Sequence, residues 1–246
     1  MLPTVAILAG GLAKRMRPRT LTLPKALIEV AGEPFIAHQL RLLRREGASE
    51  VVLCLGHLGE QVEAFVGDGG AYGLRVRYSR EGEGLLGTGG ALRKALPLLG
   101  SPFLVLYGDS YLDFAFASAL EAFRKSGLDG LMTVHRNEGA WDTSNVVFAD
   151  GRIRFYSKTR RRPDMHYIDY GLGILKAEVL EHYPADQPFD LADVYAALLE
   201  RGRLAGFEVA QRFYEIGSPA GLAETEAYLR RVGRRASAAR NAGGRG

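Results

Sequence analysis

The chain has 246 residues, of which 47% are hydrophobic and 24% are charged. This length is enough for one sizeable core, and single α/β domains of this size are common. The one cysteine, Cys54, stands in an apolar run, so an internal disulfide is excluded and a buried thiol in a cytoplasmic protein is expected.

Hydropathy and charge exclude two further classes of protein. No early apolar stretch approaches the roughly 18 residues that a membrane span needs, and the first one lacks the features of a signal peptide. The formal net charge is +4, but six arginines and no acidic residue lie in residues 230–246, and without these six charges the remainder carries −2. The body is therefore not basic, and neither nucleic acid nor a membrane is an expected partner.

The chain is expected to divide into a body and a tail. Residues 1–232 should form one domain, because no low-complexity linker interrupts them. Residues 233–246 have almost nothing apolar to bury, so a disordered basic tail is predicted there. Weak attraction of this tail to nucleic acid or anionic surfaces is the alternative.

The first predicted strand leads into a turn that suits phosphate. The apolar residues 5–9 are followed by Gly10 and Gly11, and the loop beyond carries Arg15 and, after a proline, Lys25. Glycines permit a close approach of the backbone, and backbone N–H groups together with cations bind polyphosphates. The pattern predicts a nucleoside triphosphate site, although the glycines alone also fit an ordinary strand-to-helix turn.

Strands and helices alternate along the rest of the chain. Apolar runs predict strands over 51–55, 74–78 and 103–107, and helical spacing predicts helices over 35–46, 59–66 and 88–96. The second half predicts a helix over 114–126, a strand over 130–135, a hairpin about Asp150-Gly151, a strand over 167–175, and helices over 177–183, 191–202 and 219 to about 232. We expect a Rossmann-like, doubly wound α/β fold with a mostly parallel sheet, in which the second half forms a substrate lobe on that sheet.

Ligands of such folds bind at the carboxyl ends of the strands. Asp109 comes directly after the predicted strand over 103–107 and one glycine, so its carboxylate should lie at that edge. Mg²⁺ in proteins prefers carboxylate and phosphate oxygens. Asp109 is therefore a candidate metal ligand beside the triphosphate, and a turn former or helix cap is the alternative.

Several motifs occur in an order that resembles the sugar-1-phosphate nucleotidylyltransferases. They are the opening glycine pair, arginine and Pro-Lys, then Leu86-Gly87-Thr88-Gly89-Gly90-Ala91-Leu92, Tyr107-Gly108-Asp109-Ser110 and Tyr214-Glu215-Ile216-Gly217-Ser218-Pro219. Together they cover nearly the whole chain. The resemblance implies a fold of the nucleotide-diphospho-sugar transferase type and an enzyme that joins an NTP to a sugar 1-phosphate and releases pyrophosphate.

The resemblance also assigns roles to residues of this chain. Arg15, Lys25 and Asp109 are the implied catalytic residues. The implied nucleotide-binding residues are Leu8, Ala9, Gly10, Gly11, Glu81, Gly87 and Thr88, and the implied sugar-phosphate-binding residues are Asn145, Lys158 and Asp169. Ser157 replaces the glutamate that usually precedes this lysine, and for Asn145 and Asp169 an ordinary position in a surface loop is the alternative.

Mg²⁺ is the implied cofactor, held by Asp109 and Glu215. Many relatives carry an aspartate at the second position. Glutamate keeps the charge and adds one methylene, so direct ligation, ligation through water and a purely structural role all stay open for Glu215.

The combination of Glu81, Gly87 and Thr88 most resembles the family members that accept guanine, because a carboxylate accepts hydrogen bonds from the donors of that base. GTP with mannose 1-phosphate or a heptose 1-phosphate is the favoured pair. A uridylyl- or thymidylyltransferase and a non-catalytic, nucleotide-sugar-sensing subunit are the alternatives. A redox dinucleotide enzyme is disfavoured, since the first turn lacks G-x-G-x-x-G, and assembly into a homo-oligomer stays open.

Overall fold

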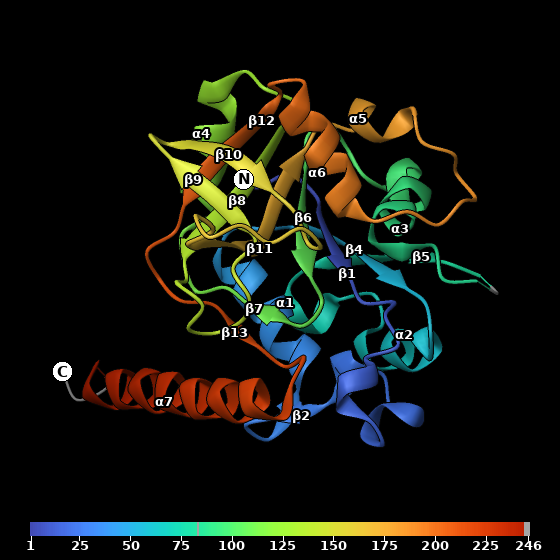
Figure 1. The fold of residues 1–246 in the computed structure, drawn as a ribbon. Helices are drawn as coiled ribbons and strands as arrows, with labels where there is room; N and C mark the ends of the chain where they lie inside the picture. The colour runs from blue at the N-terminus through green and yellow to red at the C-terminus, as the bar shows by residue number, and fades with distance from the viewer. Residues whose placement is uncertain (83, 244–246) are drawn as a thin grey trace.

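The computed structural model describes residues 1–82 and 84–243, arranged as a central sheet with helices on both sides (Figure 1). The helices are α1 (Phe35–Arg45), α2 (Gly59–Val66), α3 (Gly87–Ala95), α4 (Phe116–Ser126), α5 (Glu178–Glu181), α6 (Leu191–Glu200) and α7 (Pro219–Gly243). The strands are β1 (Val5–Leu8), β2 (Glu29–Val30), β3 (Glu33–Pro34), β4 (Glu50–Leu55), β5 (Arg75–Arg80), β6 (Phe103–Tyr107), β7 (Ser110–Tyr111), β8 (Gly130–Arg136), β9 (Val146–Ala149), β10 (Arg152–Tyr156), β11 (Tyr167–Leu175), β12 (Leu204–Glu208) and β13 (Tyr214–Glu215).

Nine of these strands form one sheet. Along its main path the order is β10-β9-β11-β6-β1-β4-β5, and β8 pairs with both β11 and β12. The strands β6, β1, β4 and β5 are parallel, and Leu8 at the end of β1 lies opposite Tyr107 of β6 and Cys54 of β4. Parallel strands end at one edge, so the residues that follow Leu8 and Tyr107 meet there. The predicted Rossmann-like fold with a mostly parallel sheet is confirmed.

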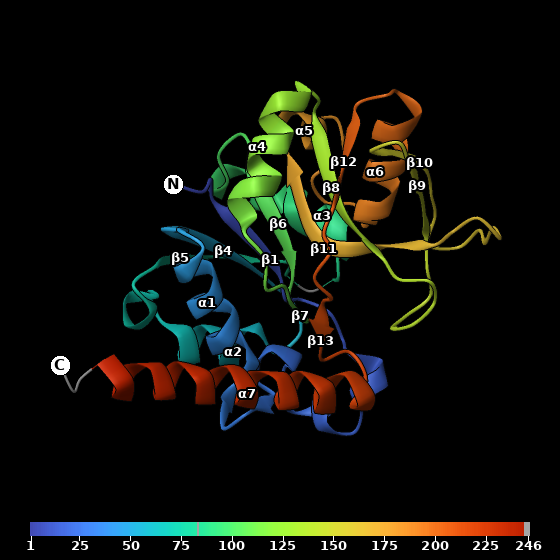
Figure 2. The same ribbon diagram turned by 90° about the vertical axis from the view of Figure 1, so that its left-hand side faces the viewer.

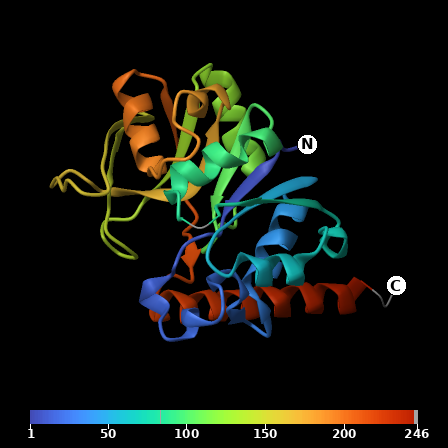
Figure 3. The ribbon, with the colours of Figure 1, turned by 90° about the vertical axis from the view of Figure 1, so that its right-hand side faces the viewer.

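Alternate strand residues face opposite sides of the sheet. Val5 and Ile7 belong to a core shared with α1, α2 and α4, whereas Ala6 and Cys54 belong to a second core beneath α3 and α6 (Figures 2 and 3). Helices cover both faces, which explains why these strands read as nearly continuous apolar runs. Burial raises the pKa of the Cys54 thiol to about 12, so it remains protonated at neutral pH.

The second half of the chain continues the same sheet. The strand β11 lies antiparallel to β6 and to β8, and β9 and β10 form the expected hairpin. Asp150 and Gly151 at its turn have φ of +52° and +69°, as a two-residue turn with left-handed residues requires. Among the described residues, no helix is both long and apolar enough to cross a membrane.

The two-residue strands β2, β3, β7 and β13 were not predicted, and two longer elements also differ from the sequence predictions. The strand β12 was not predicted, because Gly206 and Ala205 give it little strand propensity; it pairs along β8 at the side of the sheet. The helix α7 continues past Val232 to Gly243, through most of the segment expected to be disordered. Arginine and alanine are strong helix formers and dominate this segment, which favours continuation of the helix. Residues 244–246 of the expected tail lie outside the described residues.

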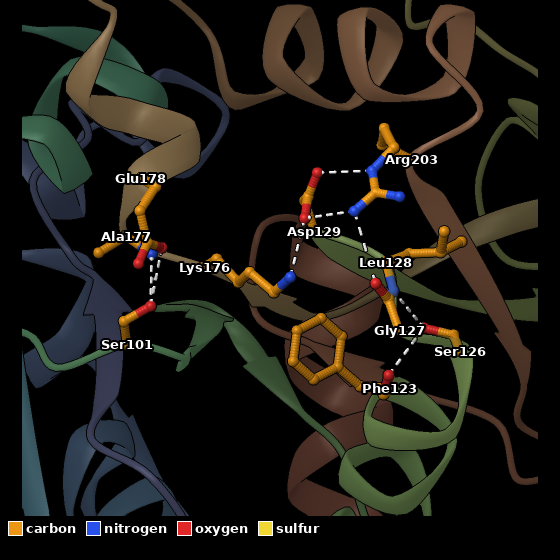
Figure 4. A network of polar contacts seen from close by, with 10 residues as sticks. All are labelled: Ser101, Phe123, Ser126, Gly127, Leu128, Asp129, Lys176, Ala177, Glu178 and Arg203. Atoms are coloured by element: carbon orange, nitrogen blue, oxygen red, sulfur yellow. Dashed lines mark hydrogen bonds and ion pairs between the residues drawn. The ribbon is translucent and has the colours of Figure 1, made fainter.

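A polar network joins three strand ends at the edge of the sheet away from β7 and β13 (Figures 1 and 4). Asp129 precedes β8 and accepts hydrogen bonds from Lys176 Nζ at 2.9 Å, just after β11, and from Arg203 Nε at 2.7 Å, just before β12. Hydrogen bonds from these two cations hold the pKa of Asp129 well below its usual range. The network therefore fixes the ends of β8, β11 and β12 relative to one another.

Candidate active site

A cavity of about 240 Å³ lies at the carboxyl edge of the sheet, beside the ends of β1 and β6 and the first turn of α3. The residues expected to bind the nucleotide all line it: Leu8, Ala9, Gly10, Gly11, Glu81, Gly87 and Thr88. Lys25 and Asp109 line it as well. The structure thus brings together three segments that are far apart in the sequence.

Lys25 and Asp109 form an ion pair at the wall of the cavity. Lys25 Nζ lies 2.7 Å from Asp109 Oδ2, and the two side chains are 20% and 30% exposed. Lys25 begins the short 3₁₀ helix Lys25–Leu27 after Pro24, whose extended backbone directs the chain toward the sheet edge. A cation and a carboxylate in contact at this edge can both respond to a phosphate or a metal ion that enters the cavity.

Arg15 and Glu215 approach Asp109 at Gly217. A Cβ built on Gly217 would lie 2.6 Å from Glu215 Oε2, 2.9 Å from Arg15 Nη2 and 3.3 Å from Asp109 Oδ2. These three charged groups therefore surround one point, and a side chain at position 217 would occupy it. A larger residue at position 217 would force these flexible charged side chains to move.

Backbone pairing explains why Glu215 reaches Asp109. The two-residue strand β13 pairs antiparallel with β7, with Glu215 opposite Ser110, and Ile216 N donates to Asp109 O at 3.0 Å. The Glu215 carboxylate also accepts hydrogen bonds from Ser218 Oγ at 2.6 Å and from Gly217 N. Glu215 thus both approaches Asp109 and braces the turn into α7.

The two carboxylates fit a magnesium ion by their chemistry, since Mg²⁺ is usually bound through one or two carboxylates and substrate phosphates. Asp109 Oδ1 contacts only Ser110 Oγ, at 3.4 Å, so one oxygen of Asp109 is free of a strong partner among the described residues. Within that part of the chain, no group of three or more His, Cys, Asp or Glu side chains gathers as a metal site. A metal held here would therefore depend on phosphate oxygens for its other ligands.

Glu81 also lines the cavity and comes directly after β5. Its Oε2 accepts a hydrogen bond from Leu86 N at 2.6 Å. Its Oε1 lies so close to Gly10 that a Cβ added to this glycine would collide with it. Burial raises the pKa of Glu81, against the opposing effects of the Leu86 N–H and the Lys94 ammonium. One carboxylate oxygen is therefore held by the backbone, and the other lies against the glycine turn.

The glycines at the start of α3 serve mainly to admit another segment of the chain. Cβ atoms on Gly87 and Gly89 would collide with the Phe189 carbonyl and the Phe189 ring, respectively. Gly89 N and Gly90 N donate to Phe189 O at 3.0 and 3.3 Å. Of this motif, Gly87 and Thr88 line the cavity, whereas Gly89 and Gly90 pack against the chain that enters α6.

The three candidates for the sugar phosphate lie outside the cavity lining, and two of them contact each other. Asp169 N donates to Asn145 Oδ1 at 2.9 Å, and Tyr107 OH, from the cavity wall, donates to Asp169 Oδ2 at 3.4 Å. Burial raises the pKa of Asp169 to about 6. Asp169 is thus separated from the cavity by a single side chain.

Lys158, the third of these candidates, is held by a residue that the sequence analysis did not single out. Its Nζ lies 2.8 and 3.0 Å from the two carboxylate oxygens of Asp190, the residue before α6. Ser157 Oγ accepts from Thr159 N and Arg160 N and so shapes the turn that carries Lys158. No spacing or motif in the sequence indicated this role of Asp190, because Asp190 and Lys158 are 32 positions apart.

Gln39 of α1 is a second residue that the sequence analysis missed. Its Nε2 donates to Tyr107 O at 3.0 Å and to Ser110 O at 2.8 Å, on either side of Gly108 and Asp109. The side chain is fully buried, and its Oε1 has no partner among the described residues. A polar residue within the apolar face of α1 was the signal that could have indicated this role.

Known proteins share this arrangement of sequence and fold. Residues 4–231 match the family model described as nucleotidyl transferase. The chain is 34% identical over 227 residues to the N-acetylmuramate alpha-1-phosphate uridylyltransferase of Neisseria meningitidis serogroup B, covering 90% of this chain and 96% of that protein. It is 30% identical to the mannose-1-phosphate guanylyltransferase catalytic subunit beta of Drosophila pseudoobscura pseudoobscura, over 87% of this chain but only 58% of the fly protein.

A solved structure has the same fold at lower identity. A Bacillus anthracis protein described as a glucose-1-phosphate thymidylyltransferase superposes with a TM-score of 0.81 and 21% identity, over 92% of this chain and 95% of that one. The family match covers nearly the full chain, and the relatives named above act on sugar 1-phosphates. The chain therefore belongs to the family of the sugar-1-phosphate nucleotidylyltransferases.

Proposed function

We propose that this nucleotidyltransferase transfers GMP from GTP to mannose 1-phosphate or a heptose 1-phosphate, giving a GDP-sugar and pyrophosphate. The observation that carries the choice of base is Glu81, which lines the cavity with its Oε2 held by Leu86 N and its Oε1 beside Gly10. Guanine presents two adjacent donors, the ring N1–H and the exocyclic amine. Uracil presents one N–H between two carbonyl oxygens, which a carboxylate does not complement.

The reaction needs little covalent chemistry from the protein. A phosphate monoester is largely ionised at neutral pH, so the sugar phosphate can attack the α-phosphorus without a general base. One P–O bond forms as the bond to pyrophosphate breaks. Catalysis then consists of positioning and charge neutralisation, for which Arg15 and Lys25 are the candidates at the triphosphate and Lys158 at the sugar phosphate.

Mg²⁺ belongs to the proposal as the cofactor. Asp109 and Glu215 would hold it, because a carboxylate oxygen of each residue lies close to Gly217. When bound, the ion would neutralise charge on the phosphate oxygens. Lys25, which pairs with Asp109 at 2.7 Å, would then be shared between that carboxylate and the substrates.

A pyrophosphate-release assay tests the proposed pair of substrates. GTP, UTP, dTTP, CTP and ATP are each combined with the 1-phosphates of mannose, D-glycero-D-manno-heptose, glucose and N-acetylmuramate. GTP should lead in kcat/KM by about 10–100-fold, because other bases leave the Glu81 carboxylate with an unpaired oxygen. A lead for UTP or dTTP would overturn the proposed base.

UTP is the second candidate, because the Neisseria enzyme, 34% identical over 90% of this chain, is named for uridylyl transfer. The substitution Glu81→Gln distinguishes the two bases. If glutamine keeps its oxygen on Leu86 N, its amide nitrogen faces the base and can donate to a uracil carbonyl. The ratio of UTP to GTP turnover should rise by about tenfold or more if Glu81 reads the base. An unchanged ratio would show that Glu81 only stabilises the loop, through its hydrogen bond with Leu86 N, and does not contact the base.

The non-catalytic sensing subunit is tested by the same assay. Such a protein would bind nucleotides or nucleotide sugars without releasing pyrophosphate from any pair. Retention of Arg15, Lys25 and Asp109 at one sheet edge favours the enzyme. Release of pyrophosphate from any pair would exclude the sensing role as the sole function.

A further inference from the structure

Asp190 connects two regions that the proposed function assigns to different substrates. Its Oδ1 accepts hydrogen bonds from Thr88 Oγ1 at 2.9 Å, from Ala192 N at 2.8 Å and from Lys158 Nζ at 2.8 Å. Thr88 lines the nucleotide cavity, and Lys158 is the candidate for the sugar phosphate. One carboxylate therefore contacts both sides of the site and also caps the first turn of α6.

The segment before α6 is fixed tightly on α3. Phe189 N donates to Leu86 O at 3.0 Å, and Thr88 Oγ1 accepts from Leu191 N at 2.8 Å. The hydroxyl of Thr88 is thus occupied by α6 and its cap. Together with the Phe189 carbonyl bonds to Gly89 N and Gly90 N, these contacts give Asp190 a defined position relative to the cavity.

Lys158 has no comparable support of its own. It lies after β10 in an exposed turn, its side chain is 37% exposed, and Asp190 is its ion-pair partner. A free lysine side chain has many rotamers, and this freedom is lost when a phosphate fixes the ammonium group. Although burial raises the pKa of Asp190, the Ala192 N–H, the Lys158 ammonium and the Thr88 hydroxyl lower it below its usual value, so the carboxylate is charged at neutral pH.

We propose that Asp190 is a positioning residue shared by the two substrate sites. It holds the Lys158 ammonium ready for the sugar phosphate and fixes Thr88 at the wall of the nucleotide cavity. The inference rests on the proposed function, in which both substrates meet at this edge, and it extends that function to a residue outside the cavity lining.

Two substitutions separate the contact of Asp190 with Lys158 from its contacts with Thr88 and Ala192. Asp190→Asn keeps an oxygen for Thr88 and Ala192, and asparagine caps helices as well as aspartate does, but it removes the charge that holds Lys158. Asp190→Ala removes all three contacts. Asp193→Asn is the matched control, because Asp193 lies in the same helix and is exposed.

Steady-state kinetics with mannose 1-phosphate and GTP give the first readout. In Asp190→Asn, the KM for mannose 1-phosphate should rise about tenfold while the KM for GTP stays within twofold, and in Asp190→Ala both KM values should rise. Asp193→Asn should match the wild type. A rise of both KM values in Asp190→Asn would indicate a merely structural role. An unchanged or lower KM for mannose 1-phosphate would overturn the proposal, since simple charge removal next to a phosphate site should strengthen phosphate binding.

A double-mutant cycle with Lys158→Ala gives the second readout. If Asp190 acts on the sugar phosphate through Lys158, Asp190→Asn should add less than twofold in the Lys158→Ala background. Additive effects would contradict this. If no substrate pair turns over, that result would count against the proposed function alone. Calorimetry would then still test the role of Asp190, by measuring the binding of inorganic pyrophosphate and of mannose 1-phosphate to the same variants without GTP.

Discussion

At the scale of single residues, the ion pair between Lys25 and Asp109 joins the opening loop to the end of β6. The two residues are 84 positions apart, and their contact of 2.7 Å at the cavity wall places a cation where the proposed nucleotidyl transfer would shift charge. Because the pair lies beside the candidate metal position, substitution of Lys25 should lower kcat/KM, whereas substitution of Asp109 should also change the Mg²⁺ requirement.

Lys25→Ala should lower kcat/KM by about 100-fold or more, since it removes one preorganised charge contact from the transition state. Steady-state kinetics measure the loss, and circular dichroism checks the fold. Lys14→Ala is the control, because Lys14 is exposed in the same loop and does not line the cavity. Turnover near that of the wild type in a folded Lys25→Ala protein would remove Lys25 from the mechanism.

Asp109→Asn should impair activity more than Glu215→Gln, because Glu215 divides its carboxylate between the Asp109 side and the turn at Ser218. Both variants should require more Mg²⁺ for half-maximal activity, and a chelator should abolish turnover of the wild type until Mg²⁺ is restored. Magnesium titrations of initial rates measure these effects. If Glu215→Gln changes neither turnover nor Mg²⁺ dependence, Glu215 serves only to brace the start of α7.

Asp169 should make stability depend on pH near 6. Burial raises its pKa to about 6, from about 4 in an unfolded chain, so the folded state disfavours the charged form. The resulting destabilisation is present above pH 6 and disappears as the pH falls toward 4. Asp169→Asn should therefore raise Tm at pH 8, and this increase should become small at pH 4. Equal shifts of Tm at both pH values would contradict the assignment.

At the scale of elements, Asp129 ties the ends of three strands by binding Lys176 and Arg203 (Figure 4). Its pKa is depressed, so its stabilisation is present above the unfolded pKa of about 4 and is lost as the pH falls below that value. Asp129→Asn should lower Tm at pH 7, and the difference from wild type should shrink in acid. Glu121→Gln, which removes an exposed pair within one helix, should change Tm little. A constant difference across the pH range would show that charge is not the cause.

Element packing also explains how α6 takes part in the site. The glycines at the start of α3 let the Phe189 carbonyl approach, and this approach brings Asp190 to Thr88. A bulky residue at position 89 would separate the two helices. The glycine-rich motif therefore shapes the site through helix packing as well as through its own surface.

At the scale of the whole molecule, six arginines and no acidic residue lie in residues 230–246, and without these six charges the rest of the chain carries a net charge of −2. In the part of α7 whose burial is described, which ends at Arg234, the buried residues are Leu222, Thr225 and Leu229. The helix lies along the side of the molecule that carries β2 and β13 (Figures 1 and 2). These three buried side chains thus anchor the part of the helix that precedes Val232.

Truncation after Val232 should leave kcat and both KM values within about twofold, because the buried residues Leu222, Thr225 and Leu229 are kept and isolated helical ends contribute little stability. Salt-sensitive binding to polyanions such as heparin, if the full chain shows it, should be lost. A large rise in the KM for the nucleotide or the sugar phosphate would show that the tail contributes to the site.

Local sequence determined most of the elements and the nucleotide side of the site. The apolar runs of β1 and β6, the Asp150-Gly151 turn and the strand β11 were all predictable, because their patterns depend on neighbours in the chain. Parallel strands end at one edge, which is why Gly10 and Asp109 could be expected to meet before the fold was known.

Tertiary structure alone decided the remaining contacts. The approach of Glu215 to Asp109 depends on the pairing of β13 with β7, and the link between Lys158 and Thr88 depends on Asp190 at the start of α6. The strand β12 exists because β8 offers it a partner, not because its own residues favour a strand. Such contacts join segments that are from 32 to 105 residues apart, so no local periodicity encodes them. They are set by the register of the sheet and the packing of α3 against α6.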